Sequence, residues 1–84
     1  DLHLKEELKN TIVANCKNQS YSQFGEYKVQ RIEDLDGWKF FFSDNEWLMI
    51  RASGTEPVLR TYAEAATKEK AFAILAATKK TLLG

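Results

Sequence analysis

Three apolar segments follow one another closely in the second half of the chain, and their spacing restricts the fold more than any other feature. They are Trp38–Ser43, Glu46–Ala52 and Val58–Glu64. Two residues separate the first two segments, and five separate the last two. Connections this short join antiparallel neighbours, because a parallel pair needs a crossover of about a dozen residues or more. The sequence therefore predicts a three-stranded antiparallel meander in this region.

A fourth strand is expected just before this meander, over residues 27–35. It is followed by Asp36-Gly37, a dipeptide typical of tight hairpin turns. The apolar positions of this strand do not alternate regularly, because Val29 and Ile32 differ in parity. A bulge, or an edge position in the sheet, would explain the slip.

Helical periodicity occurs at both ends of the chain. In residues 2–19, one apolar stripe recurs at every fourth position: Leu4, Leu8, Ile12 and Cys16. Cys16 is expected to be a core residue and not a nucleophile, and His3 a surface residue and not a ligand. A second helix is expected over residues 68–83, with Thr67 as its N-cap. Its apolar face is expected to lie near Phe72, Leu75 and Leu82, with Ala71, Ile74 and Thr78 beside it.

Residues 18–25 form a polar linker between the first helix and the first strand, with Gly25 as its expected turn. The expected order of elements is therefore α-β-β-β-β-α. Both helices need an apolar surface to cover, and one face of a four-stranded antiparallel sheet provides it. The sequence thus predicts a two-layer α+β fold, and residues 1–84 are expected to form a single domain.

The composition is that of a small globular domain, with 44% hydrophobic residues in a chain of 84. Twelve acidic residues balance twelve basic ones, so no overall field favours nucleic acid or an anionic membrane as a partner. No apolar run approaches the ~20 residues needed to cross a bilayer. A single cysteine gives no disulfide framework and favours a cytoplasmic origin. Because the chain begins at Asp1 and its one methionine is Met49, we expect it to be part of a longer protein.

The loop between the last two strands carries more chemistry than a turn requires. Residues 51–60 read Arg-Ala-Ser-Gly-Thr-Glu-Pro-Val-Leu-Arg. Ser53 and Thr55 supply hydroxyl groups, and Gly54 allows a positive φ, so that successive N–H groups can converge on an anion. The ordinary alternative is that Ser-Gly-Thr is common turn chemistry.

Two arginines, Arg51 and Arg60, stand at the edges of this loop. Alternate residues of a strand share a face, so Arg51 and Ser53 should point the same way. If the next strand returns antiparallel, Arg60 lies close to the loop as well. A guanidinium group binds phosphate or carboxylate oxygens two at a time. We therefore expect a pocket for a tetrahedral dianion, and phosphate is the best candidate.

The run Arg-Ala-Ser-Gly-Thr-Glu-Pro at residues 51–57, followed by Arg60, resembles the phosphate-binding loop of the α-D-phosphohexomutases, the phosphoglucomutase/phosphomannomutase superfamily. The similarity continues through residues 36–38 and 61–64. In that family the loop belongs to the C-terminal domain of a four-domain enzyme. The resemblance implies a TATA-binding-protein-like fold, an antiparallel sheet with helices packed on it.

The resemblance also implies an activity for a parent enzyme: reversible transfer of a phosphoryl group between the 1- and 6-positions of a hexose phosphate, through a bisphosphate intermediate. The transfer uses a phosphoserine and a Mg²⁺ ion held by aspartates, both on other domains. The partners implied are the hexose phosphate and those domains. The isolated chain is expected to bind phosphate weakly and to catalyse nothing. The resemblance leaves open whether the sugar is glucose, mannose or glucosamine.

The resemblance assigns contacts with the non-transferring phosphate to five positions: Arg51, Ser53, Gly54, Thr55 and Arg60. Arg51 is expected to clamp the phosphate, while Arg60 is the less direct contact. Glu56 is negative and would repel the ligand, so it is expected to orient an arginine or the loop backbone. Pro57 is expected to stiffen the loop exit.

Two other patterns suggest different functions and are disfavoured. Asp34 and Asp36 are paired acids, but their spacing lacks the ligands of a calcium loop. The phenylalanines at residues 40–42 resemble the stacking aromatics of RNA-binding sheets, yet those domains follow a β-α-β-β-α-β order. The alternative class is a stand-alone α+β module that binds a phosphorylated partner or RNA.

Overall fold

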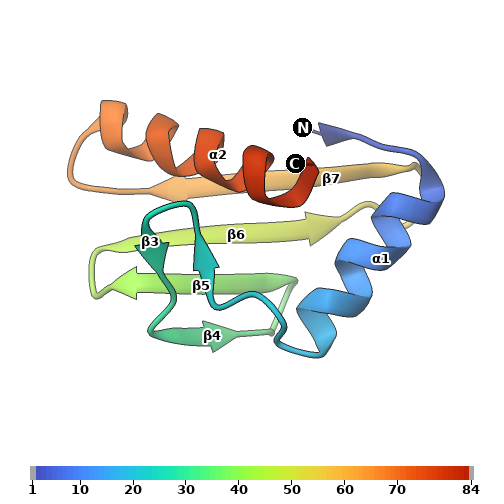
Figure 1. Cartoon of the computed structure of the whole chain (residues 1–84), viewed down its shortest axis with the longest axis horizontal. Helices are drawn as coiled ribbons and strands as arrows, with labels where there is room; N and C mark the ends of the chain where they lie inside the picture. Colours follow the sequence, from blue (N-terminus) through green and yellow to red (C-terminus); the bar gives the residue numbers. More distant parts are fainter. Residues whose placement is uncertain (1, 84) are drawn as a thin grey trace.

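A computed structural model describes residues 2–83 of the chain. These residues form seven strands and two helices. In chain order they are β1 (Leu2–His3), α1 (Glu6–Lys17), β2 (Gln23–Phe24), β3 (Tyr27–Lys28), β4 (Arg31–Glu33), β5 (Trp38–Ser43), β6 (Glu46–Ala52), β7 (Val58–Glu64) and α2 (Lys68–Leu83) (Figure 1).

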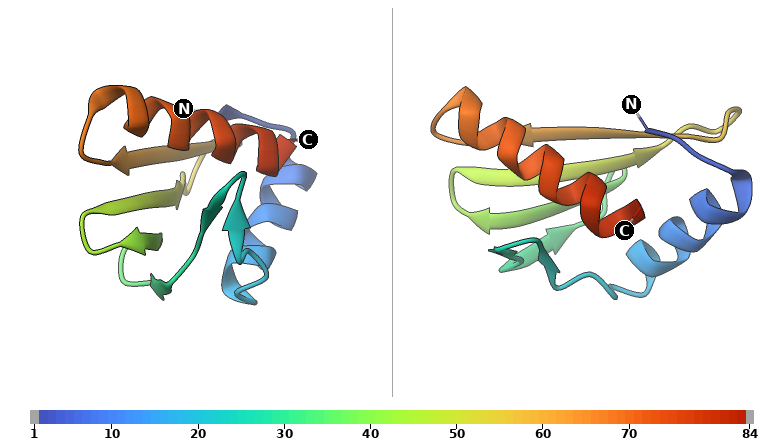
Figure 2. Two further views of the ribbon diagram at one scale, coloured as in Figure 1. Left: turned by 60° about the vertical axis from the view of Figure 1, so that its left-hand side comes forward. Right: turned by 45° about the horizontal axis from the view of Figure 1, so that its top comes forward.

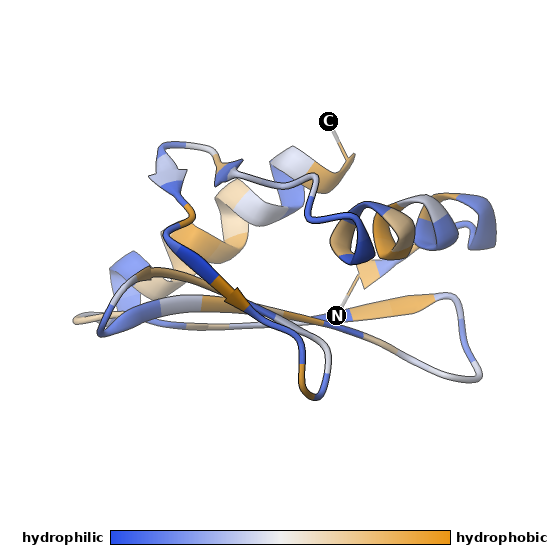
Figure 3. Ribbon diagram, turned by 90° about the horizontal axis from the view of Figure 1, so that it is seen from below, coloured by the Kyte–Doolittle hydropathy of each residue, from blue (hydrophilic) through white to orange (hydrophobic). Residues whose placement is uncertain are grey.

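The predicted α+β class is confirmed. One antiparallel sheet has the strand order β1-β7-β6-β5-β4, and β2 and β3 pair separately as a small hairpin. Both helices and the hairpin lie on one side of this sheet, which leaves the other side open (Figure 3). The predicted meander is β5-β6-β7, and its three strands begin and end where the sequence pattern placed them.

The predicted four-strand count and the order α-β-β-β-β-α are wrong at the N-terminal end. The first helix begins at Glu6, because Leu2–His3 instead adds a fifth strand to the edge of β7, with Leu2 opposite Leu59. The Leu4 N–H extends this pairing by donating to the Pro57 carbonyl at 2.9 Å. The added strand satisfies backbone groups that the edge of β7 would otherwise expose.

The strand expected over residues 27–35 is divided between two sheets. Its first part, β3, pairs with β2 around Gly25, which has a φ of 59°. Its second part, β4, is the edge strand beside β5. The slip in apolar parity between Val29 and Ile32 marks the passage from the hairpin to the main sheet.

The last helix has the expected bounds and cap, because the Lys70 N–H donates to Thr67 Oγ1 at 3.1 Å. Its buried face was predicted only in part, because Leu82 is buried and Leu75 packs against the core but Phe72 does not. Ile74, Thr78 and Leu82 are the buried positions, spaced every fourth residue. Phe72 is 67% exposed, because it lies about 200° around the helix from Ile74 and faces away from the sheet.

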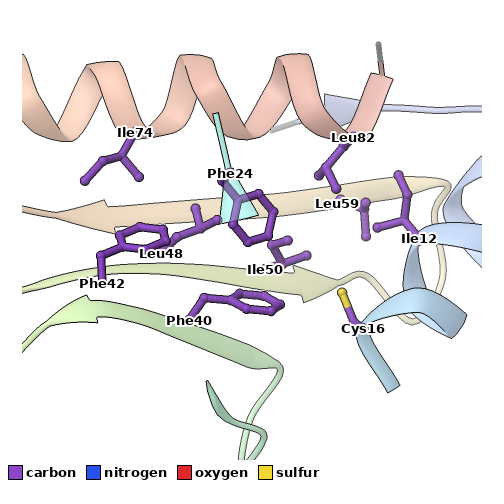
Figure 4. Packing of buried hydrophobic residues seen from close by; sticks show 10 residues of the cluster. All are labelled: Ile12, Cys16, Phe24, Phe40, Phe42, Leu48, Ile50, Leu59, Ile74 and Leu82. Atoms are coloured by element: carbon purple, nitrogen blue, oxygen red, sulfur yellow. The ribbon is translucent and has the colours of Figure 1, made fainter. Parts of the chain in front are cut away.

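The core lies between the sheet and the covering layer (Figure 4). Phe24 of the short hairpin is fully buried near its centre, and its ring lies 5.0 Å from that of Phe40. The cluster comprises Ile12, Cys16, Phe24, Phe40, Phe42, Leu48, Ile50, Leu59, Ile74 and Leu82. The four positions of the predicted α1 stripe all belong to this core or pack against it.

Cys16 gives a test of this packing. The residue is 1% exposed, and desolvation raises the pKa of its thiol from 9.0 to about 12. The folded chain thus keeps this proton where the unfolded chain loses it, so the free energy of unfolding should fall as the pH rises from about 9 toward 12.

We also expect iodoacetamide at pH 8 to alkylate Cys16 of the native chain far more slowly than that of the urea-unfolded chain, because the thiolate is the nucleophile. Similar rates for both states, measured by mass spectrometry, would contradict this placement.

Candidate functional site

The loop between β6 and β7 projects from the end of the sheet at which α1 lies (Figure 2). The strand ladder continues one step past β6, because the Ser53 N–H donates to the Val58 carbonyl at 3.1 Å. Residues 54–57 beyond it are exposed. The loop therefore stands outside the core and is accessible to a ligand.

The two arginines of the loop are direct cross-strand neighbours. Arg51 of β6 lies opposite Arg60 of β7, so their side chains share one face of the sheet. That face is the open one, because Ile50 and Leu59, the alternate residues, belong to the core. Both arginines are exposed, and neither takes part in an ion pair among residues 2–83.

Like charges directly opposite each other destabilise a sheet. An anion bound between the two guanidinium groups would remove this repulsion. The arrangement contrasts with Arg31, an arginine of the same sheet that forms a 2.7 Å ion pair with Glu33. Arg51 and Arg60 therefore bring two guanidinium groups without carboxylate partners among residues 2–83 to the loop end of the open face.

Ser53 organises the loop from within. Its Oγ accepts hydrogen bonds from the N–H groups of Thr55 at 3.4 Å and of Glu56 at 3.3 Å. These long contacts occupy the hydroxyl oxygen and leave the hydroxyl hydrogen available to donate to a ligand. Because the ladder continues to Ser53, this residue keeps the alternation of β6 and lies on the same face as Arg51.

Gly54 does not adopt the positive φ that a glycine allows. Among the glycines of residues 2–83, only Gly25 and Gly37 have a positive φ. A Cβ added at Gly54 would meet no atom within 4 Å. Neither the backbone conformation nor the packing of this chain requires a glycine here, and the open space beside it admits a close approach by a ligand. The Gly54 N–H has no hydrogen-bond acceptor within residues 2–83.

Lys9 is a loop contact that sequence reasoning missed. Its Nζ, carried by α1, donates to the Ser53 carbonyl at 2.6 Å and to the Glu56 carbonyl at 2.9 Å. These partners lie 44 and 47 positions away, and Lys9 sits among polar helix residues that give no signal of a long-range contact. The expected role of the Glu56 carboxylate stays a prediction. Pro57 is held by its carbonyl, which accepts from Leu4 N–H at 2.9 Å.

A shallow hollow of about 300 Å³ lies beside the loop. Its lining comprises Asp36, Gly37, Trp38, Arg51 and Ala52. Gly37 has a φ of 124°, and a Cβ there would lie 2.8 Å from the Ile50 carbonyl oxygen. The turn between β4 and β5 is thus pressed against the backbone that carries Arg51, and the hollow lies beside Arg51.

Comparison with known families decides the relationship. The family model of the phosphoglucomutase/phosphomannomutase C-terminal domain matches residues 7–80, which include Lys9 and the whole loop. The chain belongs to this family. The suspected resemblance is confirmed.

Relatives of this phosphomutase domain carry several names. A phosphoglucomutase/phosphomannomutase of Thermococcus kodakarensis is 44% identical over 50 residues, which cover 60% of this chain and 11% of the relative. A probable phosphoglucosamine mutase of Pyrococcus furiosus is 40% identical over 67 residues, which cover 77% and 14%. A phosphopentomutase of T. kodakarensis is 35% identical over 43 residues, which cover 51% and 10%. The chain thus matches only a small part of the length of each relative.

No group of three or more His, Cys, Asp or Glu side chains in residues 2–83 is arranged to hold a metal ion. The paired acids Asp34 and Asp36 form no such group. Among the helices of these residues, none is long and apolar enough to cross a membrane.

The phenylalanines at residues 40–42 do not form an exposed stacking surface in this domain. Phe40 and Phe42 are core residues, and Phe41 on the open face is 7% exposed. The Arg31 guanidinium covers Phe41, 3.8 Å from the ring centroid. These rings therefore make contacts within the chain. In RNA-binding sheets, by contrast, exposed aromatic rings stack on the bases of the RNA.

Proposed function

We propose that this domain anchors the non-transferring phosphate of the substrate in a phosphohexomutase that interconverts hexose 1-phosphates and 6-phosphates through a bisphosphate. Five positions hold that phosphate: Arg51, Ser53, Gly54, Thr55 and Arg60. The phosphoserine and Mg²⁺ of the parent enzyme belong to other domains, and no step of the transfer is assigned to residues of this chain. The parent is a cytoplasmic isomerase, and the isolated chain is inactive.

One observation carries this proposal. Arg51 and Arg60 lie directly opposite each other, have no ion-pair partner among residues 2–83, and stand near the Gly54 N–H, which has no acceptor there. Arg51 and Arg60 offer two guanidinium forks on one face. Gly54 adds an N–H that has no acceptor within residues 2–83, and a Cβ at this residue would meet no atom within 4 Å. Together they supply charge and directed donors for the oxygens of a phosphate dianion. Holding the phosphate that does not react also helps catalysis, because binding energy from a remote group positions the reacting end.

The names of the relatives agree with this division of labour. They differ in the sugar, with glucose, mannose, glucosamine and pentose all represented, but every one is a phosphate ester mutase. A domain that these enzymes share is better suited to recognise the common phosphate than the variable sugar. The sugar preference of the parent therefore depends on residues outside this loop.

The proposal is tested by titrating the labelled chain with inorganic phosphate and glucose 1-phosphate while recording amide NMR spectra. We expect weak, saturable shifts that concentrate in residues 51–60 and that glucose alone does not produce. Removing one charge-assisted contact by Arg51→Ala or Arg60→Ala should cost about 1.5–3 kcal/mol, or roughly ten- to a hundredfold in affinity.

Arg31→Ala is the matched control, because Arg31 is also an exposed arginine of the sheet but is paired with Glu33. Its affinity for phosphate should equal that of the unchanged chain. Shifts spread evenly over the chain, or equal losses in all three arginine variants, would reject a specific site and leave nonspecific charge attraction. Selective shifts at the β2–β3 hairpin instead of the loop would favour a different binding module.

A further inference from the structure

We propose that Lys9 is the positioning residue of the phosphate loop, and that it fixes the Ser53–Gly54 peptide so that the Gly54 N–H faces the ligand. The inference rests on the proposed function for what is bound, but not for how the loop is held. Lys9 itself is assigned no contact with the phosphate.

The direction of the Gly54 N–H follows from peptide geometry. In a planar trans peptide, the carbonyl of one residue and the N–H of the next point in opposite directions. The Ser53 carbonyl points at Lys9 Nζ, 2.6 Å away. The Gly54 N–H of the same peptide therefore points away from Lys9 Nζ, and it has no acceptor within residues 2–83.

The second bond of Lys9 closes the other end of the bend. The Glu56 carbonyl accepts from Lys9 Nζ at 2.9 Å, so one ammonium group holds both ends of the Ser53–Glu56 segment. The Glu56 carbonyl also accepts from the Val58 N–H at 2.8 Å, so without Lys9 the Ser53 carbonyl is the one left free to turn toward the ligand. Because a carbonyl oxygen carries negative partial charge, rotation of the Ser53 carbonyl toward the ligand would repel a phosphate.

The base of this connection is rigid. Lys9 is half-buried on α1, and the same helix places Ile12 and Cys16 in the hydrophobic core, each 1% exposed. The exit of the loop is held separately by the bond between Leu4 N–H and the Pro57 carbonyl. The bend is thus bonded both to the sheet and to a helix that packs in the core. This lowers the conformational entropy that the loop loses when it binds a ligand.

The test compares Lys9→Met with Lys9→Arg and with Lys17→Met, a control that removes the same charge from the exposed last turn of α1. Without ligand, ¹⁵N relaxation should show that Lys9→Met loosens residues 53–57 while the strands stay ordered. Lys17→Met should leave the loop unchanged. Lys9→Arg keeps a cationic donor, so its loop should be more ordered than that of Lys9→Met. This variant also keeps the test usable if Lys9→Met folds poorly.

With inorganic phosphate as the probe, Lys9→Met should bind about tenfold more weakly than the unchanged chain. The bonds lost are those from the Lys9 ammonium to the loop carbonyls, and a hydrogen bond to a charged group is worth about this much. An unaltered loop in the ligand-free Lys9→Met spectrum, or equal loosening by Lys17→Met, overturns the inference. If Lys9→Met loosens the loop but the unchanged chain binds no phosphate, the inference is supported and the proposed function is rejected. The two failures are therefore distinguishable.

Discussion

Replacing Phe24 by alanine should destabilise the domain by about 3–5 kcal/mol, the cost typical of emptying a buried phenylalanine site. Phe24 is fully buried, and its ring packs against Tyr21 at 5.4 Å and Phe40 at 5.0 Å between centroids. The surrounding strands and helix come from distant parts of the chain (Figure 4) and cannot all collapse onto the cavity. A domain of this size has a free energy of unfolding of roughly 4–13 kcal/mol, so the loss could remove most of it.

Urea unfolding followed by circular dichroism measures this loss. Phe72→Ala is the matched control, because Phe72 is 67% exposed on the outer side of α2. Its free energy of unfolding should change by no more than about 0.5 kcal/mol. Equal effects of the two substitutions would mean that the β2–β3 hairpin does not cover the sheet as described.

Gly37→Ala should be the most damaging of the conservative glycine substitutions. The φ of 124° at Gly37 is a conformation that side chains rarely adopt, and the new Cβ would lie 2.8 Å from the Ile50 carbonyl oxygen. The strain alone costs about 1–3 kcal/mol, and the backbone carbonyl cannot move without disturbing the strand ladder. Since the same Cβ would lie 3.4 Å from Arg51 Cα, phosphate affinity should fall together with stability.

Gly54→Ala provides the comparison on the same scale. A Cβ at Gly54 meets nothing within 4 Å, so the melting temperature should barely change. Its phosphate affinity should nevertheless fall, because the added methyl group occupies space beside the free N–H. Thermal unfolding and phosphate titration of both variants separate the two effects. If Gly54→Ala kept full affinity, close approach of the ligand to that peptide would be excluded.

Local patterns were sufficient for the second half of the chain. Strands β5, β6 and β7 and helix α2 have the predicted bounds, because each is long enough to show a periodicity and is bordered by short polar turns. Strands β1, β2 and β3 have two residues each, too few for any period, and pairing with a distant partner defines them. The burial of Ile74 in place of Phe72 likewise depended on how α2 lies on the sheet.

The composition of the loop was readable in the same way and led to the family that the comparison shows, while its phosphate contacts stay a prediction. Residue order along two adjacent strands is enough to bring Arg51 and Arg60 together once a short loop joins them, because antiparallel register follows from the connection. The contact of Lys9 with the loop and the close approach of Gly37 to β6 became visible only in three dimensions. Each depends on segments far apart in sequence being packed against one another, and no local rule encodes that packing.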